Sequence, residues 1–395
     1  MGLHTLARDL GVAARLGGRA LWRRRPGHAP DTAGAEDIHG WRAGLEAWLS
    51  SLPAGSVVEH RFVELPATRP PWTDSGLVVR PGDRLTWFAA GRVYLSRLLD
   101  IWVPPSFQLW GRVGDVGPIF RGTRATHTFE ARAPGPLQLA SYFPGEWAHP
   151  DGTLGAGVDE YSKVSGGITA LVVRWREGVD LSSLLGGSSP APEPVRAEFN
   201  RLQSSTPAPE GWDYLWYLGP GEIYRPCQAP DGGPAIRCET HGDVGILRRP
   251  VAVRLEPGTR LDWRWRVERL PADLREDSLP SHDYLSIAAE FDDGQDLTYY
   301  WSASLPAGTV YRCPLPTWMD KETHVVVRSG KSDLGRWLEQ SRDLHEDYHR
   351  IIGGPARSVV RVWLIANSLF LRGHGRCEYA GIELRRADGA AVKVL

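Results

Sequence analysis

Short runs of alternating apolar and polar residues, bounded by corners that contain proline or glycine, recur along most of this chain. In one of them, Pro81-Gly82-Asp83 leads into a run in which Leu85 and Trp87 fall on the same side by period-two alternation. The chain has 44 Gly and 31 Pro among its 395 residues, enough for many tight turns. This pattern predicts a mainly β protein made of two antiparallel β-sandwich (jelly-roll-like) domains.

The alternating runs form two groups, and the grouping predicts the domain organisation. We expect short N-terminal helices within 1–51, a β-sandwich over 52–176, a linker rich in Pro, Ser and Gly over 177–211, and a second sandwich over 212–395. The first domain is expected to hold a hairpin of 77–80 and 84–88, and strands at 107–112, 126–130, 137–142 and 168–175. The second is expected to hold strands at 246–255, 261–267, 284–291, 297–303, 323–328, 359–367 and 379–385.

Helical spacing of apolar residues is seen in three places. Trp41, Leu45 and Trp48 share one side of a predicted helix over 38–51. A second helix is predicted over 335–352, within the second domain. A third, over 1–25, carries leucines on one side and arginines on the other. Such a basic amphipathic helix lies either on a membrane surface or against its own protein.

Charge and cysteine content exclude several classes of protein. The chain has 46 basic and 47 acidic side chains, so no overall charge draws it to nucleic acid. No run reaches the roughly 20 apolar residues of a membrane span, and a cytoplasmic protein is expected, with the 1–25 segment as its one candidate for membrane contact. The four cysteines include no Cys-x-x-Cys pair, so no metal site is predicted. No cofactor is predicted either. Cys227 and Cys238 either pair across a hairpin or stay reduced.

Several short motifs are spread over the second half of the chain. They read LDWRWRV (261–267), HDY (282–284), FDDG (291–294), YWS (300–302), VVRSG (326–330), LGRW (334–337) and RDLHEDY (342–348). In these motifs the region from about 242 to 387 resembles the bacterial DUF3047 family. The resemblance implies a jelly-roll sandwich, and it implies no activity.

The first domain resembles the galactose-binding lectins of the bacterial PA-I type. The shared features are GLVV (76–79), PGD (81–83), AG (90–91), GRVG (111–114) and the run 137–142. Those lectins bind calcium and sugar through a loop rich in Asp and Asn, which corresponds to 143–152 here. In this chain only Glu146 and Asp151 could supply carboxylates there, so calcium is not expected.

The loop over 143–152 is the candidate ligand site of the first domain. Trp147 could stack on a sugar ring, and Glu146, His149 and Asp151 could form polar contacts with it. The alternative is an ordered turn in which Trp147 packs down onto the protein.

The second domain offers candidate acids and candidate ligand-binding residues. Asp283, Glu290 and Asp347 are the candidates for general acid and base catalysis, although alternation puts Asp283 and Glu290 on opposite faces of one strand. The candidate ligand-binding residues are Trp301, Arg328, Arg342 and Tyr348. Arg264 and Arg266, which alternate with two tryptophans, either bind a ligand or form ion pairs with a neighbouring strand.

The chain lacks the motifs of nucleotide hydrolysis, Rossmann redox chemistry, α/β-hydrolases and zinc proteases. Its 17 tryptophans instead suggest the binding of a glycan or polar small molecule. Two alternatives remain open. One is an enzyme acting on a glycan or polar metabolite through paired carboxylates, and the other is a structural or peripheral membrane partner.

Overall fold

The structure is a computed structural model, and it describes residues 11–19, 37–69, 71–142, 147–155, 157–187, 191–204 and 206–395. The protein is mostly β, with 44% of residues in strands and 17% in helices. Its residues divide into two compact units. The N-terminal unit comprises residues 19–205 together with 219–221. The C-terminal unit comprises residues 206–218 and 222–395, together with the described helical residues 11–18.

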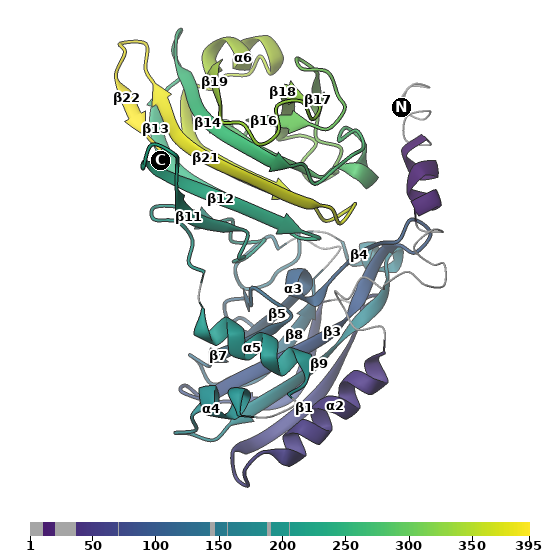
Figure 1. Cartoon of the computed structure of the whole chain (residues 1–395). Coiled ribbons are helices and arrows are strands. Elements are labelled where there is room, and N and C mark those ends of the chain that lie inside the picture. The colour runs from purple at the N-terminus through teal and green to yellow at the C-terminus, as the bar shows by residue number, and fades with distance from the viewer. Residues whose placement is uncertain are drawn as a thin grey trace. The chain divides into compact units, whose positions relative to one another are not determined.

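The N-terminal unit has two antiparallel sheets (Figure 1). The five-stranded sheet runs in the order β1-β9-β3-β4, with β7 also paired to β3, and the four-stranded sheet runs β2-β8-β5-β6. The strands are β1 (Val57–Pro66), β2 (Trp72–Val79), β3 (Arg84–Ser96), β4 (Ile101–Val103), β5 (Leu109–Val113), β6 (Phe120–Arg121), β7 (Thr126–Glu130), β8 (Gly135–Ser141) and β9 (Ser165–Trp175).

Alternation places the core of this unit between its two sheets. Leu85 and Trp87 of β3 are fully buried there with Leu77 and Val79 of β2. Burying each such side chain stabilises the fold by about 2 kcal/mol. The short helices α3 (Pro105–Gln108) and η1 (Val158–Lys163) complete the connections.

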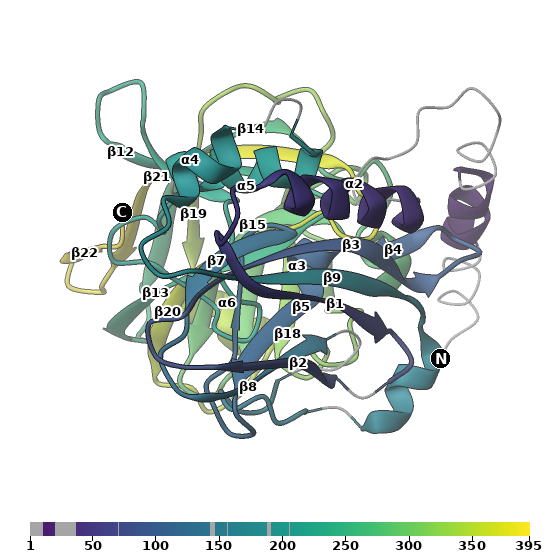
Figure 2. The same ribbon diagram turned by 90° about the horizontal axis from the view of Figure 1, so that it is seen from below.

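Helices cover the other face of the five-stranded sheet (Figure 2). The helix predicted over 38–51 is confirmed as α2 (Ile38–Ser51), and Asp37 caps it by accepting a hydrogen bond from the Gly40 N–H. Leu45 and Trp48 of α2 pack against the sheet. The segment predicted as a linker holds α4 (Leu181–Gly186) and α5 (Glu193–Gln203), whose apolar residues join the same core, so it is part of this unit.

Two local predictions for the N-terminal unit were wrong. The runs 77–80 and 84–88 do not form a hairpin, because β2 and β3 belong to different sheets. The corner at Gly82, with φ of +90°, carries the chain from one sheet to the other. The strand predicted from 107 begins at Leu109, because Phe107 lies in α3.

The C-terminal unit also has two sheets packed face to face (Figure 1). The seven-stranded sheet runs β10-β13-β20-β15-β16-β18-β17, and the six-stranded sheet runs β11-β12-β21-β14-β19, with β22 also paired to β21. The pairs are antiparallel except for β16 with β18, which is parallel. The strands are β10 (Asp213–Tyr214), β11 (Tyr224–Gln228), β12 (Pro234–His241), β13 (Val244–Arg254), β14 (Arg260–Arg269), β15 (Tyr284–Phe291), β16 (Asp296–Ser302), β17 (Val310–Arg312), β18 (Glu322–Ser329), β19 (Leu338–Asp343), β20 (Ser358–Asn367), β21 (His374–Arg385) and β22 (Ala391–Lys393).

Tryptophans of β14 fill the centre of this second core. Trp263 and Trp265 are buried with Leu261 and Val267, as period-two alternation predicts. Trp263 stacks on Tyr299 of β16 at 5.8 Å between ring centroids, and Trp265 lies 5.9 Å from Trp301. The large aromatic rings therefore hold the two sheets together.

The helix predicted over 335–352 is only partly present. Residues 338–343 form the edge strand β19, which pairs with β14, and the helix α6 covers only Leu344–Ile351. Gly335 has φ of +81°, which interrupts a right-handed helix, and Asp343 caps α6 by accepting a hydrogen bond from the Glu346 N–H. The short helix η2 (Leu279–Ser281) precedes β15.

The four cysteines are free thiols. Cys227 lies opposite Ala235 and Cys238 lies opposite Tyr224 in the β11–β12 hairpin, so the two thiols are not cross-strand partners. Cys227 and Cys238 are therefore reduced in this structure, as in the second of the two alternatives.

The N-terminal amphipathic helix is described only over 11–19, and the rest of 1–25 lies outside the described residues. In that part Val12 and Leu16 are buried, whereas Ala14 and Arg15 are exposed. Among the described residues, no helix combines the length and the apolar character that a membrane crossing requires.

Candidate functional site

The candidate loop of the N-terminal unit holds a buried tryptophan. Trp147 is 3% exposed and stacks on Trp72 with 5.3 Å between ring centroids. Tyr142 and Trp110 pack around it at 5.0 and 5.8 Å. The Trp147 ring therefore packs against the protein, which is the alternative to a platform for a sugar ring. Glu146 lies outside the described residues.

The two other polar residues of this loop bond within the loop itself. Asp151 accepts hydrogen bonds from the backbone and the hydroxyl of Thr153, and these bonds are the main cause of its lowered pKa. His149 Nδ1 lies 3.2 Å from the other oxygen of Asp151. The pair is accessible, but its polar atoms stabilise a turn.

Asp283 and Glu290 do not form a catalytic pair. Asp283 and Glu290 lie seven residues apart along one extended segment, a distance of about 23 Å at ~3.3 Å per residue. Glycoside hydrolysis needs carboxylates roughly 5–10 Å apart. Glu290 binds Arg361 and the Trp363 N–H, and Asp347 binds Arg342, Arg350 and the Tyr299 hydroxyl.

Asp283 is buried below the surface. It accepts hydrogen bonds from the backbone N–H groups of Phe370 and Leu371 at 2.9 and 2.7 Å. Burial raises the pKa of Asp283 to about 7, against the opposing effect of these two bonds. The carboxyl group therefore anchors the backbone at 370–371.

The four candidate ligand-binding residues lie in different surroundings. Trp301 is buried in the core and donates from Nε1 to the Gly330 carbonyl. Tyr348 is buried too, bonds to Asp293, and has its pKa raised to about 12, chiefly by burial. Arg342 binds Asp347 through two hydrogen bonds. Arg328 is partly exposed, with Asp333 at 4.0 Å.

The arginines that alternate with tryptophan form ion pairs. Arg264 donates to Asp231 at 2.7 Å, and this bond is the main cause of the lowered pKa of Asp231. Arg266 lies 2.8 Å from Glu378 and 2.9 Å from Glu268. The ion-pair alternative with a neighbouring strand is confirmed for Arg266, whose partner Glu378 lies on β21, whereas the partner of Arg264 lies in the turn between β11 and β12.

An open groove lies on the outer face of the six-stranded sheet, over β14, β19 and β21. Its volume is about 520 Å³. It is lined by Arg260, Asp262, Trp263, Arg264, Glu339, Gln340, Ser341, Gly381, Glu383 and Arg385. Alternation explains this lining, because residues 260, 262 and 264 point outward from the strand whose tryptophans fill the core.

A network of polar contacts surrounds Asp262 in this groove. Asp262 accepts from Arg385 Nε at 2.6 Å and from the Ser341 hydroxyl. Arg260 Nε donates to the same hydroxyl at 3.0 Å. Gly381, with φ of +56°, lies where the β14–β21 register shifts, and it leaves bare backbone in the groove. Of the groove residues, only Arg264 was predicted as a candidate, although the outward positions of Arg260 and Asp262 on β14 also follow from the alternation.

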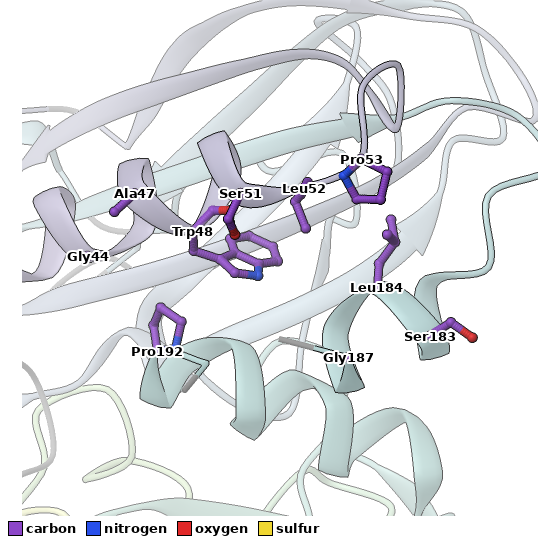
Figure 3. A pocket seen from close by; sticks show the side chains of 10 residues that line it. All are labelled: Gly44, Ala47, Trp48, Ser51, Leu52, Pro53, Ser183, Leu184, Gly187 and Pro192. Atoms are coloured by element: carbon purple, nitrogen blue, oxygen red, sulfur yellow. The ribbon is translucent and has the colours of Figure 1, made fainter. Parts of the chain in front are cut away.

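Two further hollows differ in chemistry. One of about 640 Å³ lies between α2 and the α4–α5 segment, and its wall is formed mainly by small and apolar residues such as Gly44, Ala47 and Leu52 (Figure 3). The other, of about 510 Å³, lies at one end of β12 and β21 and includes the stacked imidazoles of His241 and His374. The groove over β14, β19 and β21 has the richest set of polar side chains of the three.

Part of the chain matches a known protein family. Residues 211–383 match DUF3047, a family described as a protein of unknown function. The matched residues lie almost wholly within the C-terminal unit. This confirms the resemblance seen in the sequence, and it widens the boundaries from about 242–387 to a start at 211. No curated protein matches the chain.

Several solved structures are similar to parts of this chain. The EclA N-terminal domain, a PllA-like lectin, is 16% identical over 29% of this chain and 95% of its own, with a TM-score of 0.23. The xyloglucanase domain of NopAA from Sinorhizobium fredii is 8% identical over 45% and 94%, with a TM-score of 0.29. A carbohydrate-binding module of the β-sandwich superfamily is 11% identical over 85% and 100%, with a TM-score of 0.24.

Proposed function

We propose that the C-terminal unit binds a neutral, hydroxyl-rich ligand of the glycan class in the groove over β14, β19 and β21. The observation that carries this proposal is the balance of charge along the groove. Three arginines and three carboxylates line it, so neither sign dominates.

This balance selects among ligand classes. A strongly anionic ligand would be repelled by three carboxylates, and a polycation by three guanidinium groups. An apolar ligand would displace water from exposed polar groups such as the Glu339 carboxylate without replacing its hydrogen bonds, which costs about 1–3 kcal/mol for each group. A glycan offers hydroxyls that both donate and accept, so it can bond to carboxylates, guanidinium groups, Gln340 and Ser341 alike.

Binding is favoured over catalysis. The three acids that the sequence suggested for catalysis are separated or held by strong partners. In the groove itself, Asp262 is already bonded to Arg385 and Ser341. A carboxylate held in this way is suited to orienting a hydroxyl group, whereas the displacement or protonation steps of hydrolysis require a freer one.

The test is a printed array of oligosaccharides, followed by calorimetric titration of the strongest binder. Glu339 and Ser341 are exposed on the edge strand β19, so Glu339→Ala and Ser341→Ala should leave the core intact. We expect Glu339→Ala to weaken binding about tenfold or more, because a lost hydrogen bond to a charged group is worth about 1.5–3 kcal/mol. Ser341→Ala should weaken binding less, because a hydrogen bond between neutral groups is worth about 0.5–1.5 kcal/mol.

Glu256→Ala is the matched control, because Glu256 is an exposed acid in the turn before β14 and does not line the groove. Its affinity should equal that of the unaltered chain. An array without any binder, or equal affinities for all three variants, would overturn the proposal.

A further inference from the structure

Four side chains capable of binding a metal ion meet on the outer side of the seven-stranded sheet. They are His282, Cys313, Glu322 and His324, all buried, and their ligand atoms all lie within 4.8 Å of one another. The cluster belongs to the C-terminal unit, on the face of β15, β16 and β18 that points away from the core between the two sheets.

The topology explains how these four residues meet. Glu322 and His324 are two residues apart on β18, so they point to the same face. The Cys313 N–H donates to the Glu322 carbonyl, which continues the β17–β18 pairing and places Cys313 opposite Glu322. His282 follows η2 and directly precedes Asp283 and β15.

The orientation of His282 fits a metal ligand. Its Nδ1 lies 2.6 Å from the Glu276 carbonyl, and this contact assigns the ring proton to Nδ1. Nε2 then keeps its lone pair, and it lies 3.4 Å from Cys313 Sγ. A backbone carbonyl bonded to the distal ring nitrogen is the usual way in which proteins orient a metal-binding histidine.

The other ligands have matching surroundings. The Tyr284 hydroxyl donates to Glu322 Oε1 at 3.0 Å and holds the carboxylate in place. The Thr298 hydroxyl lies between two carboxylates, 3.1 Å from Glu322 Oε1 and 3.0 Å from Asp296 Oδ1. His324 Nε2 lies 3.4 Å from Glu322 Oε1. Neither ring nitrogen of His324 has a hydrogen-bond partner of good geometry among the described residues, although the ring is fully buried. Buried polar atoms of this kind are rare in folded proteins unless something else satisfies them.

We propose that His282, Cys313, Glu322 and His324 bind one divalent metal ion of the zinc type. The ion bonds to one nitrogen of each imidazole, to the thiolate of Cys313 and to the carboxylate of Glu322, and the Cys313 proton passes to solvent. One thiolate and one carboxylate balance the two positive charges, so the occupied centre is neutral. Two imidazoles, one thiolate and one carboxylate form a donor set that suits Zn²⁺.

The centre is structural, because protein atoms supply all four ligands and each is buried. Tetrahedral zinc spaces its ligand atoms about 3.3–3.8 Å apart, given bonds of about 2.0–2.3 Å. Binding therefore contracts the cluster slightly. It also ties the segments that hold His282 and Cys313 to β18, so we expect metal to stabilise the C-terminal unit.

The experiment uses the full chain without an affinity tag. The protein is treated with a chelator, checked for its fold by circular dichroism, and titrated with Zn²⁺ or Co²⁺. We expect about one equivalent to bind, a higher melting temperature, and a thiolate-to-cobalt charge-transfer band. Cys313→Ala should abolish the band and weaken zinc binding at least tenfold. Cys377→Ser, at a buried cysteine outside the cluster, should change neither.

Surface histidines provide the competing explanation. His241 and His374 stack at 3.8 Å, and His345 and His349 lie 4.2 Å apart, so either pair could take up zinc weakly. Neither pair includes sulfur, and binding there would give no charge-transfer band. If Cys313→Ala fails to fold, the test uses His282→Gln instead. We expect the charge-transfer band in the unaltered chain and its loss in His282→Gln. A folded chain that binds neither ion, or that binds cobalt without the band, would overturn the proposal.

Discussion

Asp262 of β14 and Arg385 of β21 form an ion pair across neighbouring strands, with 2.6 Å between Oδ2 and Nε. The pair lies in the open groove, where the Asp262 side chain keeps about a fifth of its surface exposed. Pairs that remain accessible to water contribute about 1 kcal/mol or less to stability. Under the proposed function, this pair also orients the hydroxyl groups of the ligand.

Asp262→Asn separates these two roles. The change removes the charge while it keeps the size of the side chain, and the Ser341 and Arg385 contacts lose strength. We expect affinity for the glycan found on the array to fall about tenfold, with a change of less than about 1 kcal/mol in the free energy of unfolding. Calorimetric titration and urea unfolding measure the two quantities. A stability loss of several kcal/mol with unchanged affinity would contradict the assignment.

His127 makes the stability of the N-terminal unit depend on pH. Burial, helped by Arg201, lowers the pKa of His127 from 6.5 to about 4. The unfolded chain therefore binds one proton more than the folded chain between these values, and stability falls as the pH drops from about 6.5 to 4. At pH 5 the loss amounts to about 2 kcal/mol, at about 1.4 kcal/mol per pH unit.

His127→Phe should remove this contribution while it keeps the contacts of the ring with Trp87 and Phe129. Hydrogen exchange of the β3 and β9 amides, corrected for intrinsic rates at each pH, reports the stability of the unit. The exposed His149 provides the control, and His149→Gln should keep the acid sensitivity of the unaltered chain. An unchanged slope in His127→Phe would show that other groups are responsible.

Glu198 attaches α5 to the N-terminal unit. Its side chain is fully buried, accepts from the Thr126 hydroxyl at 2.7 Å, and pairs with Arg201 at 2.6 Å. Glu198→Ala leaves both partners unsatisfied, and we expect a loss of about 2–4 kcal/mol. Glu193→Ala, at an exposed position on the same helix, should cost less than about 0.5 kcal/mol. Thermal unfolding of the two variants tests this, and equal melting temperatures would refute the role of Glu198.

The strands were predictable wherever burial alternates strictly. In β14 the positions of Leu261, Trp263 and Trp265 mark one buried face, and α2 was found from its apolar stripe at its full length. The assignment of strands to sheets was not predictable in the same way. The corner at Gly82 is compatible both with a hairpin and with a crossing between sheets, and only the pairing of β3 with β9 decides between them.

The segment 335–352 shows why local spacing can mislead. Its charges and aromatic residues repeat at helical intervals, yet residues 338–343 extend along the free edge of β14 and gain its backbone hydrogen bonds.

The sites were harder still to predict. Trp147 and Trp301 were proposed as ligand platforms because tryptophan can stack, but residue type does not reveal that both rings are buried. His282 and Cys313 are 31 residues apart and meet only through the fold.

Hydrogen–deuterium exchange of the full chain, with and without the glycan selected on the array, tests the proposed binding groove most directly. We predict slower exchange of the backbone amides in β19 and in the part of β21 around Gly381, with no change in residues 147–155 of the N-terminal unit. Protection confined to 147–155, or no protection in either region at saturating ligand, would contradict the account.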